Sequence, residues 1–539
     1  MRYLWFVIPI ALGTLLRLWG ISRQILLGDE IHGVRSALNL TLTEILTTYR
    51  LADPCIPLSA LYRILMASGI RLSEELIRAP AVISGLAILV LFPLAATRWR
   101  DLAGDWRRGE AFAWLLAVSP SLVYYSRFAR PYAAVVLLAP LAAAAFWRWW
   151  RGGGLRWAVV YAVAASTSAW FFLGSVPFIV APLGWAAADL ALSKARTQMV
   201  GPRRGLFALA ATAAGLTAGM AILILPAMPS LLRLIRKKAG GASVEAAELA
   251  DLLRLQAGTD WLAVVLLFWG LALVGLTRFG KRYPALASYM LALVFVQWVG
   301  IALILRPAGI GLPVVFNRYT LMCLPIVLLW VAEGVAELRK WLGKRSRLVE
   351  KGVLLCCMAV LALTGPYAAD PALHLGPFAG AWPAFAIYRK PPALPDAAVP
   401  AVYRQIAAEP GHEPVIEAIF ERTAIHSLGE TIALARHHGK PVILVVDDPW
   451  RHDPRLALHT VVPPDPLAIE RSGGRFLVLQ LDRHRLRRLE KGQVSPLATS
   501  RETRSVLLAR DFAAVLTRSW GDPHLASGDI LVWDLAQVN

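Results

Sequence analysis

Long apolar stretches recur along this chain, and they constrain the fold more than any other feature of the sequence. A helix that crosses a bilayer needs roughly 17 to 25 mostly apolar residues, because the hydrocarbon core is about 30 Å thick. We identify about 11 such stretches, near residues 2–20, 76–97, 110–126, 131–150, 157–173, 174–190, 206–227, 261–277, 284–305, 319–337 and 352–368. The block 157–190 is divided at Gly174, because a single helix of that length would exceed the membrane thickness. With 57% hydrophobic and 17% charged residues, the sequence predicts a polytopic α-helical membrane protein.

The positive charge of the chain lies in its apolar part. The net charge is +20, but residues 370–539 hold 19 basic and 19 acidic residues, so the whole excess lies upstream. Basic clusters occupy alternate loops, at residues 98–108, 148–156, 194–204, 278–282 and 339–351. Cytoplasmic loops are enriched in Lys and Arg, so we expect these loops in the cytoplasm, together with the N-terminus, whose first apolar run lacks a signal-peptide cleavage site. The distribution disfavours a nucleic-acid partner and predicts an external location for residues 21–75, 228–260 and the C-terminal part.

The composition changes near residue 370, which predicts two domains joined by a linker. Residues 1–370 are expected to form the transmembrane domain, and the Pro-rich segment 371–400 is typical of a semi-rigid linker. Residues 401–539 alternate short β-rich runs with helical stretches, which predicts an external soluble α/β domain. Its expected elements are strands at 415–420, 442–446, 476–481 and 530–533 and a helix at 428–438. Residues 401–539 contain no dinucleotide-binding, phosphate-loop or nucleophile-elbow motif.

Acidic residues follow the first apolar stretch, at the expected external surface of the membrane. Asp29 and Glu30 are adjacent, so their side chains point in different directions, and one could act as a general base while the other positions a partner. The alternative for Asp29 is that its side chain caps the following helix. His32 is the only histidine upstream of residue 370, and it leaves open a metal site with Glu30. Asp53 is either a second functional carboxylate or a turn residue before a proline.

Basic residues also occur in the expected external segments, against the general charge bias. Arg127 and Arg130 lie between two apolar stretches with almost no loop, Arg318 precedes the tenth stretch, and Lys237 belongs to the basic cluster 233–238. Guanidinium groups at this depth can bind a lipid phosphate, since they donate two parallel hydrogen bonds to it. The alternative is that each side chain only extends to the lipid headgroups. The middle parts of the stretches contain no ionisable residue, which disfavours a proton-driven carrier.

Five motifs occur in the order that a known family shows. They are the Asp-Glu pair at 29–30, the Asp-Pro-x-x-Pro-Leu segment at 53–62, LIRAPAVISG at 76–85, YYSRFARPYA at 124–133 and FNRYTLMCLP at 316–325. On these motifs residues 1–370 resemble the bacterial members of glycosyltransferase family 39. These are GT-C membrane glycosyltransferases, related to protein O-mannosyltransferases and to the aminoarabinose transferase that acts on lipid A. The family often has His-Pro-Pro-Leu-Tyr-Tyr where this chain has Asp53-Pro54-Cys55-Ile56-Pro57-Leu58.

The resemblance implies a GT-C-like fold and an inverting glycosyltransferase in the bacterial plasma (inner) membrane. The donor would be a polyprenyl-phosphate-linked sugar, and the acceptor a hydroxyl of a lipid, glycan or protein on the external, periplasmic face. Asp29 would match the catalytic carboxylate with Glu30 beside it, and the donor phosphate would bind Arg127, Arg130 and Arg318. Further expected substrate contacts are His32, Asp53, Tyr62, Tyr132, Tyr319 and Lys237. The family implies no required cofactor, and dependence on a divalent metal stays open, with Glu30 and His32 as its expected ligands.

Two other classes of function fit the same sequence. A flippase or exporter of lipid-linked sugars would share the many apolar stretches and the external basic residues, but it would need no carboxylate at Asp29. A non-catalytic membrane scaffold is the third interpretation, because the C-terminal domain is nearly neutral and lacks catalytic motifs. Release of free polyprenyl phosphate distinguishes a transferase from both.

Overall fold

The computed structural model of this chain divides into two units. It describes residues 4–23, 26, 28–50, 54–98, 106–194, 205–241, 244–259, 261–307, 313–342, 352, 399–411, 413–418, 440, 442–446, 449–481, 500–527 and 529–538. The first unit comprises Met1–Trp19, Asp29–Ile64 and Ile77–Pro371, and the second comprises Gly20–Gly28, Leu65–Leu76 and Ala372–Asn539. Asp53, the expected apolar stretch at 352–368 apart from residue 352, and the expected helix at 428–438 lie outside the described residues.

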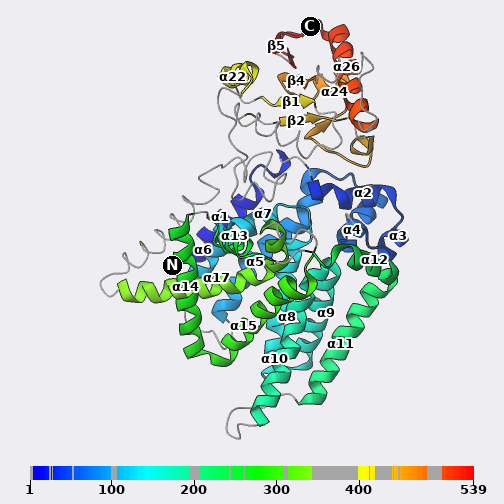
Figure 1. Cartoon of the computed structure of the whole chain (residues 1–539). Helices are drawn as coiled ribbons and strands as arrows, with labels where there is room; N and C mark the ends of the chain where they lie inside the picture. The colour runs from blue at the N-terminus through cyan, green and yellow to red at the C-terminus, as the bar shows by residue number, and fades with distance from the viewer. Residues whose placement is uncertain are drawn as a thin grey trace. The chain divides into compact units, whose positions relative to one another are not determined.

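In the described residues of the first unit the regular elements are helices, joined by turns and short extended segments (Figure 1). Its helices include α1 (Leu4–Leu18), α2 (Ile31–Asn39), α3 (Leu42–Thr47), α4 (Ile56–Ala67), α5 (Glu74–Arg98), α6 (Trp106–Val118), α7 (Pro120–Ser126), α8 (Tyr132–Trp150), α9 (Leu155–Phe171), α10 (Val176–Lys194), α11 (Leu206–Ile224), α12 (Met228–Lys238), α13 (Ala246–Ala257), α14 (Leu262–Arg282), α15 (Pro284–Val299), α16 (Pro313–Thr320) and α17 (Leu324–Leu342). Short 3₁₀ or π turns adjoin several of them, among them η2 (Gly28–Glu30), η4 (Leu225–Ala227) and η5 (Gly300–Leu305). Within the described residues, 7 helical segments are long and apolar enough to cross a membrane. The chain is therefore a polytopic α-helical membrane protein, as the sequence predicted.

Breaks in the predicted spans occur where the sequence contains helix-ending residues. The expected stretch at 110–126 is divided at Ser119 and Pro120, because Pro at the first position of α7 cannot continue α6. The block 157–190 is divided at Gly174, which confirms the predicted hairpin of α9 and α10. Since α1 and α9 have 15 and 17 residues, they fall below the length of the 7 segments, and the number of 11 spans stays a prediction.

Helices α14 and α17 pack with their backbones in direct contact. A Cβ atom at Gly275 would overlap the carbonyl oxygen of Trp330, and a Cβ atom at Gly334 would overlap that of Leu271. Burial of apolar surface does little to join two helices inside a lipid bilayer, so close packing of small residues stabilises the pair instead. Glycine at both positions therefore sets the distance between these two helices.

The second unit is built on one mixed sheet, whose strands are β1 (Val415–Ala418), β2 (Val442–Val445), β3 (Val461–Val462), β4 (Phe476–Gln480), β5 (Leu525–Ser527) and β6 (Ile530–Asp534). The strand order is β3-β2-β1-β4-β6-β5. The four strands from β3 to β4 pair in parallel, with Val415 opposite both Val442 and Phe476, whereas β6 pairs antiparallel with β4 and β5. The strands β1, β2, β4 and β6 correspond to the four runs that the sequence predicted, whereas β3 and β5 were not predicted.

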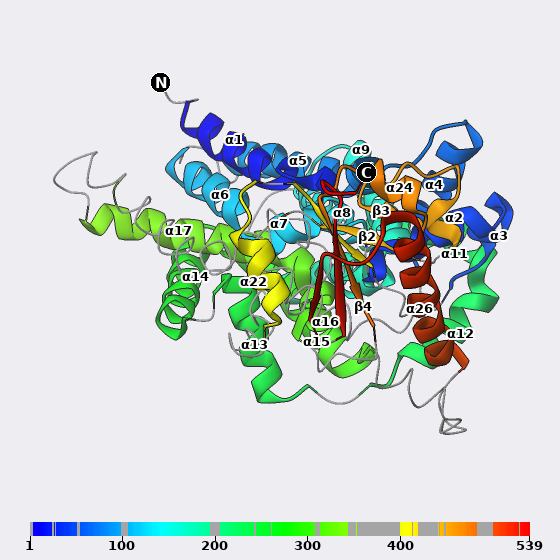
Figure 2. The same cartoon turned by 90° about the horizontal axis from the view of Figure 1, so that it is seen from above.

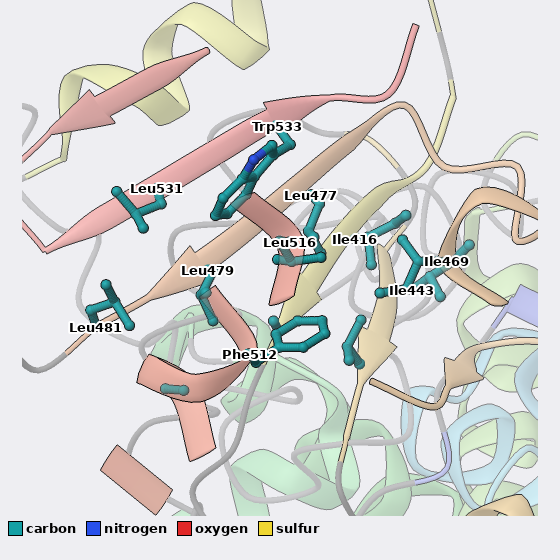
Figure 3. Packing of buried hydrophobic residues seen from close by; sticks show 13 residues of the cluster. Ile416, Ile443, Ile469, Leu477, Leu479, Leu481, Phe512, Leu516, Leu531 and Trp533 are labelled. Carbon is teal, nitrogen blue, oxygen red and sulfur yellow. The ribbon is translucent and has the colours of Figure 1, made fainter. Parts of the chain in front are cut away.

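Apolar side chains leave both faces of this sheet and pack against helices. On one face Ile416, Leu479 and Trp533 pack with Phe512 of α26 (Ser500–Trp520) and Ile469 of α24 (Pro466–Glu470) (Figure 3). The other face packs against α22 (Ala401–Ala408), through the side chains of Val402, Tyr403, Ile406, Val415, Val478 and Val532. Figure 2 shows α22 and α26 on opposite sides of the strands. Residues alternate between faces along each strand, and because helices cover both faces, β1, β2 and β6 are buried at every position, so near-continuous apolar runs produce this α/β sandwich.

Candidate functional site

A carboxylate and a guanidinium from distant parts of the chain meet in the first unit. Asp29 lies in η2 directly before α2, and Arg318 lies in α16. The Nη1 atom of Arg318 donates to Oδ2 of Asp29 over 3.0 Å. The side chain of Asp29 is 37% exposed and that of Arg318 is 15% exposed, so the carboxylate stays accessible while its partner is mostly buried. The N-cap position of α2 is Glu30, whose side chain makes no capping hydrogen bond among the described residues, so Asp29 is not the N-cap residue of this helix.

Three further basic groups surround Asp29. Nη1 of Arg130 donates to the backbone oxygen of Asp29 over 3.4 Å, and Nε2 of His32 is 4.0 Å from Oδ1. The side chain of Lys238, at the end of α12, interacts electrostatically with Asp29, Arg130 and Arg318. Burial raises the pKa of Asp29, but Arg318, Arg130 and His32 together lower this pKa below its ordinary value. Asp29 is therefore an ionised carboxylate at neutral pH within a group of cations.

Glu30 points away from this group and is fully buried. Nε and Nη2 of Arg78 donate to its two carboxylate oxygens, each over 3.0 Å, and the backbone N–H of Ala129 donates to Oε1 over 2.9 Å. This paired geometry satisfies both charges without water. Glu30 thereby connects η2 to α5 and to the turn between α7 and α8. The arrangement fits a positioning role, because the oxygens of Glu30 already have donors.

The turn that supplies the arginines is fixed by its own sequence and by α1. Helix α7 ends at Ser126, and α8 begins after Pro131, so residues 127–131 form a tight connection. Arg127 is buried and donates to the carbonyl oxygens of Leu16 and Trp19, over 3.0 and 2.7 Å, at the end of α1. The structure thus directs Arg127 toward α1, whereas Arg130 contacts Asp29. A phosphate contact of Arg127 stays a prediction.

Aromatic rings line the guanidinium of Arg318. The guanidinium carbon lies 5.7 Å from the ring centre of Tyr132, and this ring packs edge-on against Tyr125 and Phe172 with centroid distances of 5.1 and 5.5 Å. The ring of Tyr319 packs against Phe172 at 4.9 Å. A cation beside aromatic faces is held in place by the ring quadrupole. Tyr132 therefore belongs to the same site as Asp29 and Arg318. The ring of Phe172 lies between the ring of Tyr132 and that of Tyr319 in this series of contacts.

Tyr62 has a structural partner. Its hydroxyl donates to the carbonyl oxygen of Ile77 over 2.6 Å, and its ring lies against Gly33, where a Cβ atom would be 3.3 Å from the ring. The ring is 1% exposed. The structure therefore uses Tyr62 to pack α4 against α2, and a direct substrate contact of Tyr62 stays a prediction.

Sequence reasoning did not assign Arg78, and from the basic cluster 233–238 it singled out Lys237, although the spacing in α12 favours Lys238. In α12, Leu231, Leu234 and Lys238 are spaced as neighbours on one helical face, and the two leucines are buried, while Lys237 is exposed. This spacing places Lys238, and not Lys237, on the same face of α12 as the two buried leucines. For Arg78 no local pattern distinguishes a buried partner of Glu30 from a charge at the end of a span.

Among the described residues, the expected metal ligands Glu30 and His32 belong to no group of three ligand-type side chains. The oxygens of Glu30 accept from Arg78 and Ala129, and His32 lies near Asp29. Among the described residues, the group of three ligand-type side chains that the structure brings together does not include either of them. Metal dependence at this site stays a prediction.

Neither a protein-family model nor a curated protein sequence matches this chain. Among solved structures, it is similar to ArnT from Cupriavidus metallidurans bound to undecaprenyl phosphate, with 15% identity and a TM-score of 0.46 over 91% of this chain and 95% of that one. It is also similar to the archaeal oligosaccharyltransferase AglB from Archaeoglobus fulgidus in complex with an inhibitory peptide and a dolichol-phosphate, with 13% identity and a TM-score of 0.42 over 90% and 70% of the two chains. The arabinofuranosyltransferase AftD from Mycobacteria is similar with 15% identity and a TM-score of 0.42, over 89% of this chain and 35% of that one. The function proposed below rests on the site geometry and on the sequence motifs.

Proposed function

We propose that this protein is an inverting GT-C-type glycosyltransferase that uses a polyprenyl-phosphate-linked sugar. The observation that carries the proposal is an ionised carboxylate, Asp29, held against Arg318 with Arg130 and Lys238 beside it. A transfer to a hydroxyl group needs a base for the hydroxyl proton and fixed cations for the phosphate that leaves. The site contains both kinds of group within one cluster. The order of motifs in residues 1–370 resembles that of glycosyltransferase family 39.

The reaction would proceed in one displacement at the anomeric carbon. The oxygen of the acceptor hydroxyl forms a bond to the anomeric carbon while Asp29 accepts the hydroxyl proton. The bond from that carbon to the phosphate oxygen breaks at the same time. The electron pair of the broken bond stays on the polyprenyl phosphate, whose charge Arg318 and Arg130 stabilise. Attack opposite the leaving group inverts the configuration of the sugar.

The ion pair of Asp29 and Arg318 couples donor binding to the strength of the base. Arg318 is one of the groups that keep the pKa of Asp29 low. When donor phosphate competes for the guanidinium, Asp29 loses part of this stabilisation and becomes a stronger base. The carboxylate would thus become most basic when the donor is bound, which limits unproductive protonation before binding.

We also propose the orientation and the compartment. The charge bias of the loops supports an N-terminus in the cytoplasm of a bacterial cell and a reaction on the periplasmic face of the inner membrane. The acceptor is then a lipid, glycan or protein of the cell envelope. The C-terminal part of the chain would be periplasmic as well.

The test is release of free polyprenyl phosphate from a panel of polyprenyl-phosphate sugars, in proteoliposomes with crude envelope as the source of acceptor. Wild-type protein should release the lipid phosphate from one sugar donor, and Asp29→Asn should not. A matched control is Asp251→Asn, because Asp251 is 29% exposed and also pairs with an arginine, Arg254, at 3.1 Å. Equal release by wild type and Asp29→Asn would refute the role of Asp29. Movement of the intact donor across the bilayer without release would instead indicate a flippase.

A further inference from the structure

Two short segments of the second unit run side by side and bring ligand-type side chains together. The backbone N–H of Leu72 donates to the oxygen of Arg455 over 3.0 Å, and that of Ala457 donates to the oxygen of Leu72 over 2.9 Å. These two bonds form an isolated parallel bridge between Leu72 and Leu456. Two residues after this bridge in the first segment is Glu74, and three residues after it in the other is His459. Both segments belong to the same unit by their contacts.

The carboxylate of Glu74 is held rigidly by one of its oxygens. Oε1 accepts from the backbone N–H groups of His459 and Thr460, over 2.8 and 2.9 Å, and from the hydroxyl of Thr460 over 2.8 Å. Glu74 is 0% exposed, and its other oxygen, Oε2, has no hydrogen-bond partner among the described residues. A buried carboxylate oxygen without a donor is unfavourable, because it has lost its hydrogen bonds to water and has no hydrogen bond from the protein in their place. Such an oxygen points to a ligand.

Glu75 and His459 complete the group around this carboxylate. One potential ligand atom from each of Glu74, Glu75 and His459 lies within 4.8 Å of the others. Glu75 is partly buried and His459 is exposed, so an ion could enter from solvent. Zn²⁺ binds carboxylate oxygen and imidazole nitrogen at about 2.0 to 2.2 Å, so small rotations of Glu75 and His459 would let all three atoms share one ion.

We propose that Glu74, Glu75 and His459 bind a divalent transition-metal ion of the Zn²⁺ type. Two carboxylates and one imidazole form a mixed oxygen and nitrogen donor set, which favours Zn²⁺ and similar ions over Mg²⁺ or Ca²⁺, whose ligands are oxygens. The hydrogen bonds from the 459–460 backbone to Oε1 orient the Glu74 carboxylate, as groups behind a metal ligand commonly do. The ion would link the first turn of α5 to the segment that leads into β3. This site shares no residue with the group around Asp29, so it is independent of the proposed transferase chemistry.

The experiment measures metal content and stability of the full-length protein in detergent. Protein stripped with EDTA is dialysed against Zn²⁺ or Co²⁺, and the bound ion is counted by mass spectrometry while the Co²⁺ absorption bands report nitrogen and oxygen ligation. Wild type should bind about one ion per chain, and the ion should raise its unfolding temperature. Glu75→Gln and His459→Ala should weaken binding at least about tenfold and remove the thermal shift.

Controls separate ligation from misfolding and from adventitious binding. Asp522→Asn and His524→Ala change an exposed carboxylate and an exposed imidazole of the same unit, outside the proposed site, and should bind the ion like wild type. Glu74→Gln removes a buried group and could fail to fold, so the exposed His459 and the partly buried Glu75 carry the test. Absence of binding by wild type, or equal binding by wild type and both of these variants, would overturn the proposal.

Discussion

Asp29 and Arg318 are 289 residues apart in the chain, and their side chains meet at 3.0 Å. Asp29 follows the first apolar helix, and Arg318 precedes the tenth predicted span, so the contact brings the two ends of the described helical unit to one place. In the proposed reaction these residues are the base and a phosphate ligand. Because they form an ion pair, the positive charge of Arg318 lowers the proton affinity of Asp29.

Replacing Arg318 by Gln should change both donor binding and the pH profile. Loss of the charged hydrogen bond should raise KM for the donor roughly 10- to 100-fold, the effect of about 1.5 to 3 kcal/mol. Arg318 lowers the pKa of Asp29, so without it this pKa rises and Asp29 becomes protonated at higher pH. The acid side of the rate profile should therefore move to higher pH, since only the ionised carboxylate accepts a proton.

The measurement is the rate of polyprenyl phosphate release against pH for wild type and Arg318→Gln, at subsaturating donor, where the profile reports the pKa of Asp29 in the donor-free protein. Arg254→Gln is the matched control, because it breaks a comparable pair with Asp251 on α13. An unchanged acid limb in Arg318→Gln would show that Asp29 is not the base whose ionisation limits the rate.

Lys238 and Lys237 should differ although they are neighbours. Lys238 interacts electrostatically with Asp29, Arg130 and Arg318, whereas the side chain of Lys237 is exposed. Lys238→Gln should raise KM for the donor or the acceptor roughly 3- to 10-fold, as expected for about 1 kcal/mol of charge interaction. Lys237→Gln serves as the control and should change KM little. Steady-state kinetics of both variants test this, and equal effects would remove Lys238 from the site.

Local patterns in the sequence predicted the elements of this protein well. Apolar length predicted the 7 described helical segments that are long enough to cross a membrane, and Gly174 correctly divided α9 from α10. Short β-rich runs predicted β1, β2, β4 and β6 of the second unit, whereas β3 and β5 were not predicted. The break at Ser119 and Pro120 was missed, although Pro at the start of a helix is a known signal.

Contacts between distant elements could not be predicted in the same way. The sequence indicated that Asp29 and Glu30 point in different directions, but the side on which each lies depends on how α5, α8 and α16 pack around them. Arg127 and Arg130 likewise look equivalent in the sequence, and only the position of α1 shows that Arg127 donates to its carbonyl oxygens. The helical spacing of Lys238 was the one tertiary signal that was readable and was not used.

The buried pair of Glu30 and Arg78 should be required for stability. Arg78→Leu leaves the carboxylate of Glu30 buried, with the N–H of Ala129 as its remaining donor among the described residues, which should cost about 3 to 5 kcal/mol. Asp251→Asn, which breaks a partly exposed pair, should cost about 1 kcal/mol or less. Thermal unfolding in detergent compares the two variants. Similar unfolding temperatures for Arg78→Leu and wild type would mean that Glu30 does not depend on this partner.

Glu417 should make the stability of the second unit depend on pH. This carboxyl group lies in β1 between the sheet and α22, where Tyr403 donates to Oε2 over 3.2 Å and Oε1 has no partner among the described residues. Burial raises the pKa of Glu417 from 4.5 to about 8, and the hydrogen bond from Tyr403 lowers it only in part. The folded state therefore holds a proton that the unfolded chain releases above pH 4.5, so stability is full below that pH and falls as pH rises to about 8.

Glu417→Gln should remove this dependence, because the amide has nearly the same shape and carries no charge at any pH. Between pH 5 and pH 8 the unfolding temperature of the second unit should fall in wild type and change much less in Glu417→Gln, with the variant the more stable protein at pH 8. Differential scanning calorimetry of the full chain measures this, and the exposed Glu413→Gln should follow wild type. A parallel fall in Glu417→Gln and wild type would place the titrating group elsewhere, since a neutral amide at this position cannot release a proton.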